Sequence, residues 1–215
     1  MICMVDTKII EAIKKAREGN KRNFKQSFDL AINLKNIDLK KPENKIKTEI
    51  KMPHGIGKET NIGVIVDSLF NQSQDIPNLI VLKKENLEAY GKNKKEAKKL
   101  ARQCKYLLAE ASLMPLVGRF LGPILAPKNL MPMPIPANAN LKAMIEEKRN
   151  VLKIHLKDSP TIHIVVGTED IEDEKIAENI DAIIKNVMSK LPKGKDQIKN
   201  YVVKLTMGKP VKFKL

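Results

Sequence analysis

The 215-residue sequence contains no tryptophan, and aromatic residues make up only 4% of it. Its core must therefore be built mainly from Ile, Leu, Val, Met and Ala, which a hydrophobic content of 42% allows. Cysteine is also scarce, because only Cys3 and Cys104 are present and they form no Cys-x-x-Cys motif. Two isolated cysteines predict neither a disulfide framework nor a thiolate metal site, and they fit a reducing, cytoplasmic location.

Long hydrophobic runs are missing as well. No run approaches the roughly 20 residues that a membrane-spanning helix needs. Charged residues such as Asp6, Lys8 and Glu11 interrupt the beginning of the chain, so we expect no signal peptide. The sequence therefore predicts no membrane partner.

Acidic residues are outnumbered by basic ones. The chain has 25 Asp and Glu against 40 Lys and Arg, which gives a formal net charge of +15. A surplus of this size favours a polyanionic partner such as a nucleic acid, the alternative being a solvated lysine-rich surface that binds nothing.

The motifs of common enzyme active sites are not found in the sequence. Residues 55–58, Gly-Ile-Gly-Lys, resemble a phosphate-binding loop, but Met52 and Glu59 stand where that loop needs Gly and Ser or Thr. The three histidines, at positions 54, 155 and 163, have no Cys, Asp or Glu cluster with metal-ligand spacing around them. We expect no catalytic activity, no metal and no cofactor.

Hydrophobic periodicity predicts two styles of secondary structure. Polar and hydrophobic residues alternate in half-buried strands at 28–34, 46–52, 151–157 and 162–166, the last two joined as a hairpin through a turn at 158–160. Continuous hydrophobic runs predict strands covered on both faces at 62–66, 79–82 and 106–109. Helices are expected at 6–18, 93–104, 141–149 and 176–187, a basic loop at 190–199, and final strands at 201–205 and 211–215.

This order of elements predicts an insertion. Residues 1–56 and 151–215 would form one α+β domain, and residues 57–150 a separate α/β domain with a parallel sheet. Gly55 and Gly57 lie at the first crossing, where their conformational freedom suits a hinge. Both domains are basic, so charge alone does not identify the binding domain.

Residues 116–136, LVGRFLGPILAPKNLMPMPIP, contain five of the 12 prolines. Each proline fixes φ and removes a backbone donor, so we expect an ordered but irregular loop with no regular helix or inner strand. Arg119 and Lys128 would be presented from this loop, either beside packing residues or as part of a binding surface.

Five segments carry a resemblance to a known family. They are NFKQSFDLAINLKNIDLKKPEN (23–44), MPHGIGK (52–58), LVGRFLGPILAPKNLMPMP (116–134), VGTEDIEDEKIAENI (166–180) and KLTMGKP (204–210). In this order and spacing, over nearly the whole chain, the sequence resembles the universal large-subunit ribosomal protein L-one family, and its archaeal branch in particular.

The resemblance implies both a fold and partners. Such proteins have a discontinuous split βαβ (ferredoxin or RRM-like) domain that holds both termini, and an inserted Rossmann-like three-layer α/β domain. They bind 23S-type rRNA in the large subunit and form the mobile stalk beside the exit-site tRNA, and many repress translation by binding their own mRNA. The resemblance implies a cytoplasmic, ribosome-associated protein that is a monomer when free of the ribosome, without catalytic activity or metal.

The resemblance also implies an RNA-binding site on the discontinuous domain. Phe24 matches the aromatic residue that opens the first strand, and Ser27 matches the hydroxyl three residues later. Thr206, Met207 and Gly208 match a Thr-Met-Gly turn. Hydroxyls suit ribose 2′-OH groups and phosphates, glycine lets RNA approach the backbone, and methionine packs against ribose or base.

Four further residues are candidates for RNA contacts. Arg22 and Lys25 flank the aromatic residue and can neutralise phosphates. His155 and Lys157 lie on the polar face of the predicted hairpin.

Two departures from the family pattern bear on this site. Bacterial members typically carry Asp and Thr where this chain has Lys25 and Ser27, and Lys209 follows the Thr-Met-Gly turn here. A core position for Phe24 and a strand-end packing role for Met207 are the alternatives to RNA contact.

Two other classes of function remain open from the sequence. One is a nucleotide-binding α/β enzyme that uses the inserted domain, and the other is a nonspecific basic RNA-binding protein. Arg119 and Lys128 are expected to serve a secondary contact with rRNA or tRNA.

Overall fold

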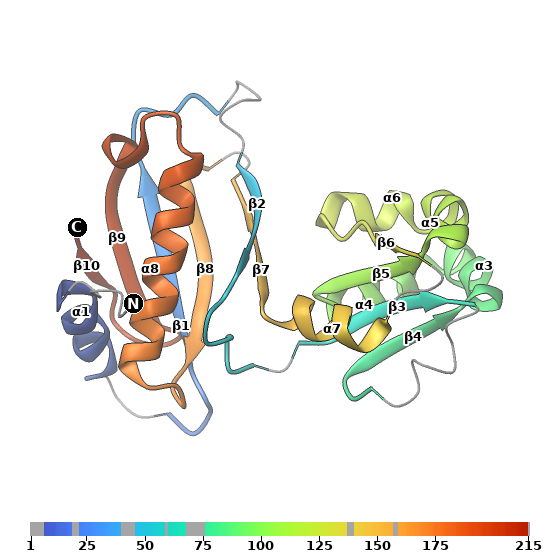
Figure 1. The fold of residues 1–215 in the computed structure, drawn as a ribbon, viewed down its shortest axis with the longest axis horizontal. Helices are drawn as coiled ribbons and strands as arrows, with labels where there is room; N and C mark the ends of the chain where they lie inside the picture. Colours follow the sequence, from blue (N-terminus) through green and yellow to red (C-terminus); the bar gives the residue numbers. More distant parts are fainter. Residues whose placement is uncertain are drawn as a thin grey trace. The chain divides into compact units, whose positions relative to one another are not determined.

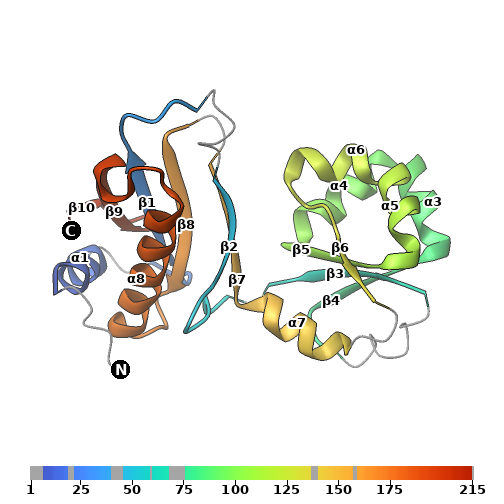
Figure 2. The same ribbon diagram turned by 45° about the horizontal axis from the view of Figure 1, so that its top comes forward.

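The computed structural model describes residues 7–18, 22–39, 46–58, 60–67, 76–136, 140–156 and 159–214. The chain divides into two compact units (Figures 1 and 2). Unit 1 comprises Met1–Lys58 and Asn150–Leu215, and unit 2 comprises Glu59–Arg149. The predicted mixed α/β architecture with several sheets is confirmed.

Unit 1 contains two antiparallel sheets and two long helices. Its elements are α1 (Thr7–Arg17), β1 (Ser27–Leu34), β2 (Lys47–Lys51), β7 (Val151–His155), β8 (Thr161–Thr168), α8 (Asp173–Lys190), η4 (Gly194–Gln197), β9 (Ile198–Leu205) and β10 (Val211–Phe213). The strand order is β10-β9-β1-β8 in one sheet and β2-β7 in the other. Because β8 and β9 both run antiparallel to β1 and α8 connects them, β8, α8 and β9 form a split β-α-β unit around β1.

The core of unit 1 follows from the alternation in its strands. In β1 every second side chain is buried, beginning with Phe28 and ending with Leu34. Helices α1 and α8 cover this face of the sheet (Figure 1). The stripe on α8 repeats at helical spacing, so Ile176, Ile180 and Ile183 reach the same core.

The predicted hairpin between residues 151–157 and 162–166 is wrong. β7 pairs with β2 in its own sheet, with Ile154 opposite Thr48, whereas β8 pairs with β1, with Ile164 opposite Leu30. Alternation identifies each strand and its buried face, but it does not identify the partner strand. The basic loop predicted at 190–199 is also partly wrong, because η4 and the first residues of β9 lie within it.

Unit 2 contains one parallel sheet. Its elements are β3 (Ile62–Val66), β4 (Leu79–Lys83), α3 (Lys84–Lys92), α4 (Lys94–Gln103), β5 (Tyr106–Glu110), η2 (Ala111–Leu113), α5 (Met114–Phe120), α6 (Gly122–Leu125), η3 (Ala126–Lys128), β6 (Met133–Ile135) and α7 (Leu141–Arg149). The strand order is β4-β3-β5-β6, and all neighbouring pairs are parallel, which confirms the predicted parallel sheet. Helices α3 to α6 lie on one side of the sheet and α7 on the other (Figure 2).

The predicted irregular loop at 116–136 is wrong, because this segment forms α5, α6, η3 and β6. Pro115, Pro123 and Pro127 each occupy the first or second position of a short helix. An N–H in the first turn has no partner within its helix, so proline costs little there. Pro134 lies in β6, the edge strand of the sheet, where a missing donor is tolerated.

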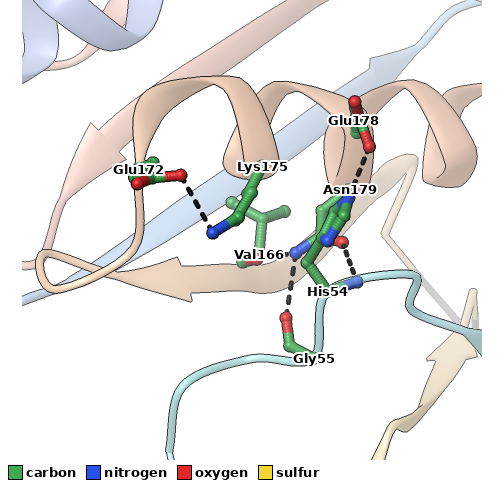
Figure 3. Close-up of polar contacts among 7 residues, drawn as sticks. All are labelled: His54, Gly55, Val166, Glu172, Lys175, Glu178 and Asn179. Atoms are coloured by element: carbon green, nitrogen blue, oxygen red, sulfur yellow. Dashed lines mark hydrogen bonds and ion pairs between the residues drawn. The ribbon is translucent and has the colours of Figure 1, made fainter. Parts of the chain in front are cut away.

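The segment before the first crossing between the units is a packed turn of unit 1 (Figure 3). Asn179 on α8 is completely buried. Its Oδ1 accepts the N–H of His54 at 3.2 Å, and its Nδ2 donates to the carbonyl oxygens of Gly55 at 2.9 Å and Val166 at 3.1 Å. The ring of His54 also contacts the carboxylate of Glu178.

The two glycines of this turn have a role that the hinge prediction did not anticipate. Both have positive φ, +66° at Gly55 and +70° at Gly57. A Cβ added at Gly57 would lie 2.5 Å from Thr168 Oγ1 and 2.9 Å from Ile171 Cδ1. The glycines therefore allow a left-handed turn to pack closely against β8 and the residues that follow it.

Two properties of the described residues bear on the sequence predictions. None of their helices is long and apolar enough to cross a membrane. Cys104 is buried, and its burial raises the pKa of the thiol to about 11, so it carries little thiolate at neutral pH.

Candidate nucleic-acid interface

The Thr-Met-Gly segment is a tight turn at the end of β9, fixed to the beginning of β1. The N–H of Gly208 donates to the carbonyl oxygen of Leu205 at 2.9 Å, which makes Thr206 and Met207 the central residues of the turn. The N–H of Thr206 donates to the carbonyl oxygen of Ser27 at 3.1 Å. A Cβ at Gly208 would lie 3.0 Å from Leu205 Cβ, so glycine permits this closeness.

The hydroxyl of Thr206 is used within the protein. Its Oγ1 accepts the N–H of Ser27 at 3.1 Å and donates to the carbonyl oxygen of Ser27 at 3.2 Å. Thr206 therefore positions the turn and has limited capacity to bond RNA. The side-chain hydroxyl of Ser27 forms no hydrogen bond within the described residues, so it is the more available of the two groups.

Two large hydrophobic side chains project from these segments into solvent. Phe24 is 51% exposed and Met207 is 61% exposed, and Met131 in unit 2 is the only other exposed large hydrophobic residue among those described. The alternative in which Phe24 belongs to the core is therefore wrong, and that position is taken by Phe28. We use "the Met207 surface" for Arg22, Phe24, Ser27, Thr206, Met207 and Gly208.

A buried glutamine connects the segments that form this surface. Gln26 is only 2% exposed. Its Oε1 accepts the N–H of Met207 at 3.1 Å, and its Nε2 donates to Glu169 Oε1 at 2.9 Å. The backbone N–H of Gln26 donates to Glu169 Oε2 at 3.2 Å, and the N–H of Glu169 donates to the carbonyl oxygen of Gln26 at 3.0 Å. These four bonds hold the Met207 turn and the loop after β8 against the beginning of β1.

Replacing Gln26 with methionine should disturb the Met207 surface without removing any exposed residue. The variant keeps the side-chain length but leaves the Met207 N–H and a Glu169 carboxylate oxygen without their partner, so the free energy of unfolding should fall by about 1–3 kcal/mol. RNA affinity, measured well below the unfolding temperature, should fall about tenfold because the turn is no longer fixed. Gln103→Met on α4, an exposed position, should change neither quantity, and an unchanged affinity for Gln26→Met would contradict the positioning role.

An acidic loop borders the Met207 surface on one side. Residues 169–174 read Glu-Asp-Ile-Glu-Asp-Glu. Arg17 on α1 holds this loop: its Nη1 donates to the carbonyl oxygen of Glu169 at 2.8 Å, its Nη2 donates to that of Ile171 at 3.0 Å, and its Nε donates to Asp173 Oδ1 at 2.9 Å. The acidic loop would repel RNA phosphates approaching from this side.

Lys25 faces the same acidic loop. Its Nζ lies 2.9 Å from Asp170 Oδ2, and this hydrogen bond and charge raise the pKa of the Lys25 ammonium. Both side chains are largely exposed, so water and salt screen the pair. Lys25 keeps its positive charge, but a phosphate would have to compete with Asp170 for it, so it is a weaker candidate for phosphate contact than Arg22.

A basic hollow also borders the Met207 surface. Its volume is about 440 Å³, and its lining residues are Lys15, Ala16, Glu18, Arg22, Met207, Gly208 and Lys209. Three basic side chains and one acid surround the exposed thioether. This side of Met207 therefore suits the sugar-phosphate backbone, and Lys209, which follows the Thr-Met-Gly turn, is one of the bases that line the hollow.

The remaining sequence-predicted residues are not joined to this surface. His155 lies half-buried on β7, in a different sheet from β1, which begins at Ser27, and β9, which precedes Thr206. Lys157 lies outside the described residues. Arg119, at the end of α5, and Lys128, in η3, belong to unit 2.

In a parallel sheet with the order β4-β3-β5-β6, a nucleotide would bind where the strand order reverses, at the carboxyl ends of β3 and β5. The neighbouring crevice lies at the carboxyl ends of β3 and β4. It is lined by Val66, Asp67, Lys83, Lys84, Glu85 and Glu88. The N–H of Asp67, directly after β3, donates to Glu110 Oε2 at 2.9 Å, so a carboxylate occupies the place that a phosphate oxygen would take. The described residues also contain no cluster of three or more metal-ligating side chains. This crevice does not favour a phosphate ligand.

Sequence reasoning missed the residues that support the site. Gln26, Arg17 and Glu169 act on segments more than 140 positions apart in the chain, so no local pattern marks them. The sequence places Lys15 on the polar side of the helix predicted at 6–18, but it does not mark this residue as part of the site.

Comparison with known proteins places the sequence among close relatives. Residues 13–209 match the Ribosomal protein L1p/L10e family. The chain is 47% identical over 206 residues to a large ribosomal subunit protein uL1 of Methanothermobacter thermautotrophicus, which covers 95% of this chain and 97% of that protein. It is 46% identical over 208 residues to the protein of the same name from Methanocaldococcus jannaschii, with 96% and 94% coverage. For that of Thermococcus kodakarensis the identity is 42% over 207 residues, with 95% and 96% coverage. The matched range includes both segments of the Met207 surface.

Proposed function

Because the chain belongs to the Ribosomal protein L1p/L10e family, we propose that it binds large-subunit rRNA through the Met207 surface. Members of this family are structural ribosomal proteins, and the protein is accordingly ribosome-associated and cytoplasmic. The observation that carries the proposal is the exposure of Phe24 and Met207 on a backbone fixed by hydrogen bonds. Solvent-exposed hydrophobic side chains on a rigid frame are typical of a binding surface.

The chemistry of the surface fits recognition of RNA by shape and 2′-OH groups. The ring of Phe24 and the thioether of Met207 offer apolar contacts to bases or riboses, and the hydroxyl of Ser27 can bond a 2′-OH group. The tight turn at Gly208 lets a backbone approach closely. None of these groups reads a base edge in a paired helix, so the specificity comes from the three-dimensional shape of the RNA.

The charge around the surface indicates the path of the RNA. Lys15, Arg22 and Lys209 line the basic hollow beside Met207, whereas residues 169–174 form a separate acidic border. The sugar-phosphate backbone should therefore run over the hollow and avoid the acidic loop that Arg17 holds against α1.

The proposal also covers the position of the protein in the ribosome and the regulation of its own synthesis. The bound rRNA element forms the mobile stalk, beside the exit-site tRNA, and the free protein is a monomer. An RNA with the same shape in the protein's own mRNA would occupy the same surface, and its binding would repress translation. The relatives named as large ribosomal subunit proteins support a place in the large subunit, and the shape-dependent recognition proposed above would let a second RNA of the same shape bind.

Salt dependence and competition test the proposal together. With three phosphates neutralised by the basic hollow, the logarithm of the affinity for a stalk rRNA fragment should fall with the logarithm of salt concentration with a slope of about −2 to −3. Bulk tRNA in excess should displace little of the bound fragment, whereas the protein's own mRNA leader should compete. Equal competition by bulk tRNA would instead identify a nonspecific basic RNA-binding protein.

A further inference from the structure

The most strongly charged helix of unit 2 is α4 (Lys94–Gln103). Its buried side is formed by Ala97, Leu100 and Ala101. Its exposed side carries five bases and one acid, Glu96; the bases are Lys94, Lys95, Lys98, Lys99 and Arg102. The helix lies in the group that covers one side of the parallel sheet (Figure 2).

The bases of α4 repel one another when no ligand is bound. They follow one another at spacings of three and four residues, for example Lys94, Lys98 and Arg102, so like charges are neighbours on the helix surface. Within the described residues none of the five bases enters an ion pair. By contrast, Lys185 on α8 pairs with Asp181 of the same helix, and Lys175 pairs with Glu172, the residue directly before α8.

A sixth base is fixed next to this face by the fold. The Nζ of Lys128, in η3, donates to the carbonyl oxygen of Lys98 at 3.2 Å. This bond holds the proline-rich segment against α4 and adds an exposed cation to the five bases of the helix. We use "the α4 face" for Lys94, Lys95, Lys98, Lys99, Arg102 and Lys128.

We propose that the α4 face is a second RNA-binding surface, which contacts the phosphates of the RNA backbone independently of sequence. Lysines are flexible point charges that suit such contacts, and the α4 face offers no aromatic group for base stacking. The unpaired, closely spaced cations are complementary to the regularly spaced charges of a nucleic acid. The α4 face shares no residue with the Met207 surface, so this inference goes beyond the proposed function and does not depend on it.

The test uses the full chain with the Met207 surface disabled by Phe24→Ala and Met207→Asp. In that background, Lys95→Gln, Lys98→Gln and Lys99→Gln are introduced together, since glutamine keeps the helix propensity. The matched control removes the same charge from unit 1 by Lys185→Gln, Lys190→Gln and Lys195→Gln. The ligand is an RNA duplex unrelated in sequence to rRNA, titrated between low and moderate salt.

The α4 substitutions should weaken binding about tenfold at low salt and flatten the salt slope by about 2, because up to three phosphate contacts are lost. The control should change the affinity by less than about twofold, the effect of net charge alone. Equal losses in the two triple variants, or no loss in the α4 variant, would overturn the proposal. A second variant, Lys94→Gln with Arg102→Gln, should independently weaken RNA binding as well. Failure of the proposed rRNA site would appear separately, as unchanged stalk rRNA binding by the background variant.

Discussion

Replacing Met207 with aspartate should weaken binding of a large-subunit stalk rRNA fragment on the order of 100-fold, because an apolar contact is lost and a carboxylate meets RNA phosphates. Met207 is 61% exposed, so its side chain contributes little to packing and the unfolding temperature should not change. Phe24→Ala should weaken the same complex about tenfold, the usual effect of losing one stacking platform. Fluorescence or filter-binding titration at fixed salt measures both effects.

Met131 provides the matched control for this experiment. It is 46% exposed, the same type of residue, and belongs to unit 2. Met131→Asp adds the same charge to the protein and should leave stalk rRNA affinity within about twofold of the original value. If Met131→Asp and Met207→Asp weakened binding equally, the effect would come from net charge and the Met207 surface would not be the primary site.

Replacing Asn179 with alanine should lower the free energy of unfolding of unit 1 by about 3 kcal/mol. The side chain is fully buried and makes three hydrogen bonds to the backbone of His54, Gly55 and Val166 (Figure 3). Its removal leaves those groups without a partner and releases the turn that ends the first segment of unit 1. Urea denaturation followed by circular dichroism measures the change.

The same helix contains a control for this loss. Asn186 on α8 has a buried Oδ1 without a hydrogen-bond partner in the described part of the chain. Asn186→Ala should therefore be nearly neutral, or slightly stabilising, because it removes a polar atom that is buried but not bonded. A loss below about 1 kcal/mol for Asn179→Ala, or an equal loss for the two variants, would contradict the role given to the Asn179 bonds.

The sequence was sufficient to predict those elements that depend on a local pattern of residues. Alternation from Phe28 to Leu34 identified β1 and its buried face, and the continuous run at 62–66 identified a central strand of the parallel sheet. It was insufficient where the outcome depends on partners far along the chain. Nothing in residues 151–166 shows that β7 pairs with β2 and β8 with β1, since register and partner depend on tertiary contacts.

The proline-rich segment shows a second kind of limit. Counting prolines predicted an irregular loop, but the position of each proline matters more than the number. Pro115, Pro123 and Pro127 all fall at helix beginnings, where proline is favoured. They lie eight and four residues apart, which leaves room for one short helix to begin at each proline.

In the candidate site, too, the sequence predicted some residues and missed others. Its exposed groups, Phe24 and Met207, could be named from motifs, and the structure places both in solvent. The groups that hold them in place could not, because Gln26 acts through Glu169 and Met207, which lie 143 and 181 residues away. The acidic border at 169–174 was likewise visible in the sequence, but its position beside Lys25 was not.

The central claim is that the Met207 surface selects one structured element of large-subunit rRNA. A hydroxyl-radical footprint of the unaltered protein on large-subunit rRNA, compared with those of Met207→Asp and Met131→Asp, tests it most directly. We predict one compact protected region that persists with Met131→Asp and disappears with Met207→Asp at the same protein concentration. Protection that is unchanged by Met207→Asp, or spread along the rRNA without a defined site, would contradict the claim.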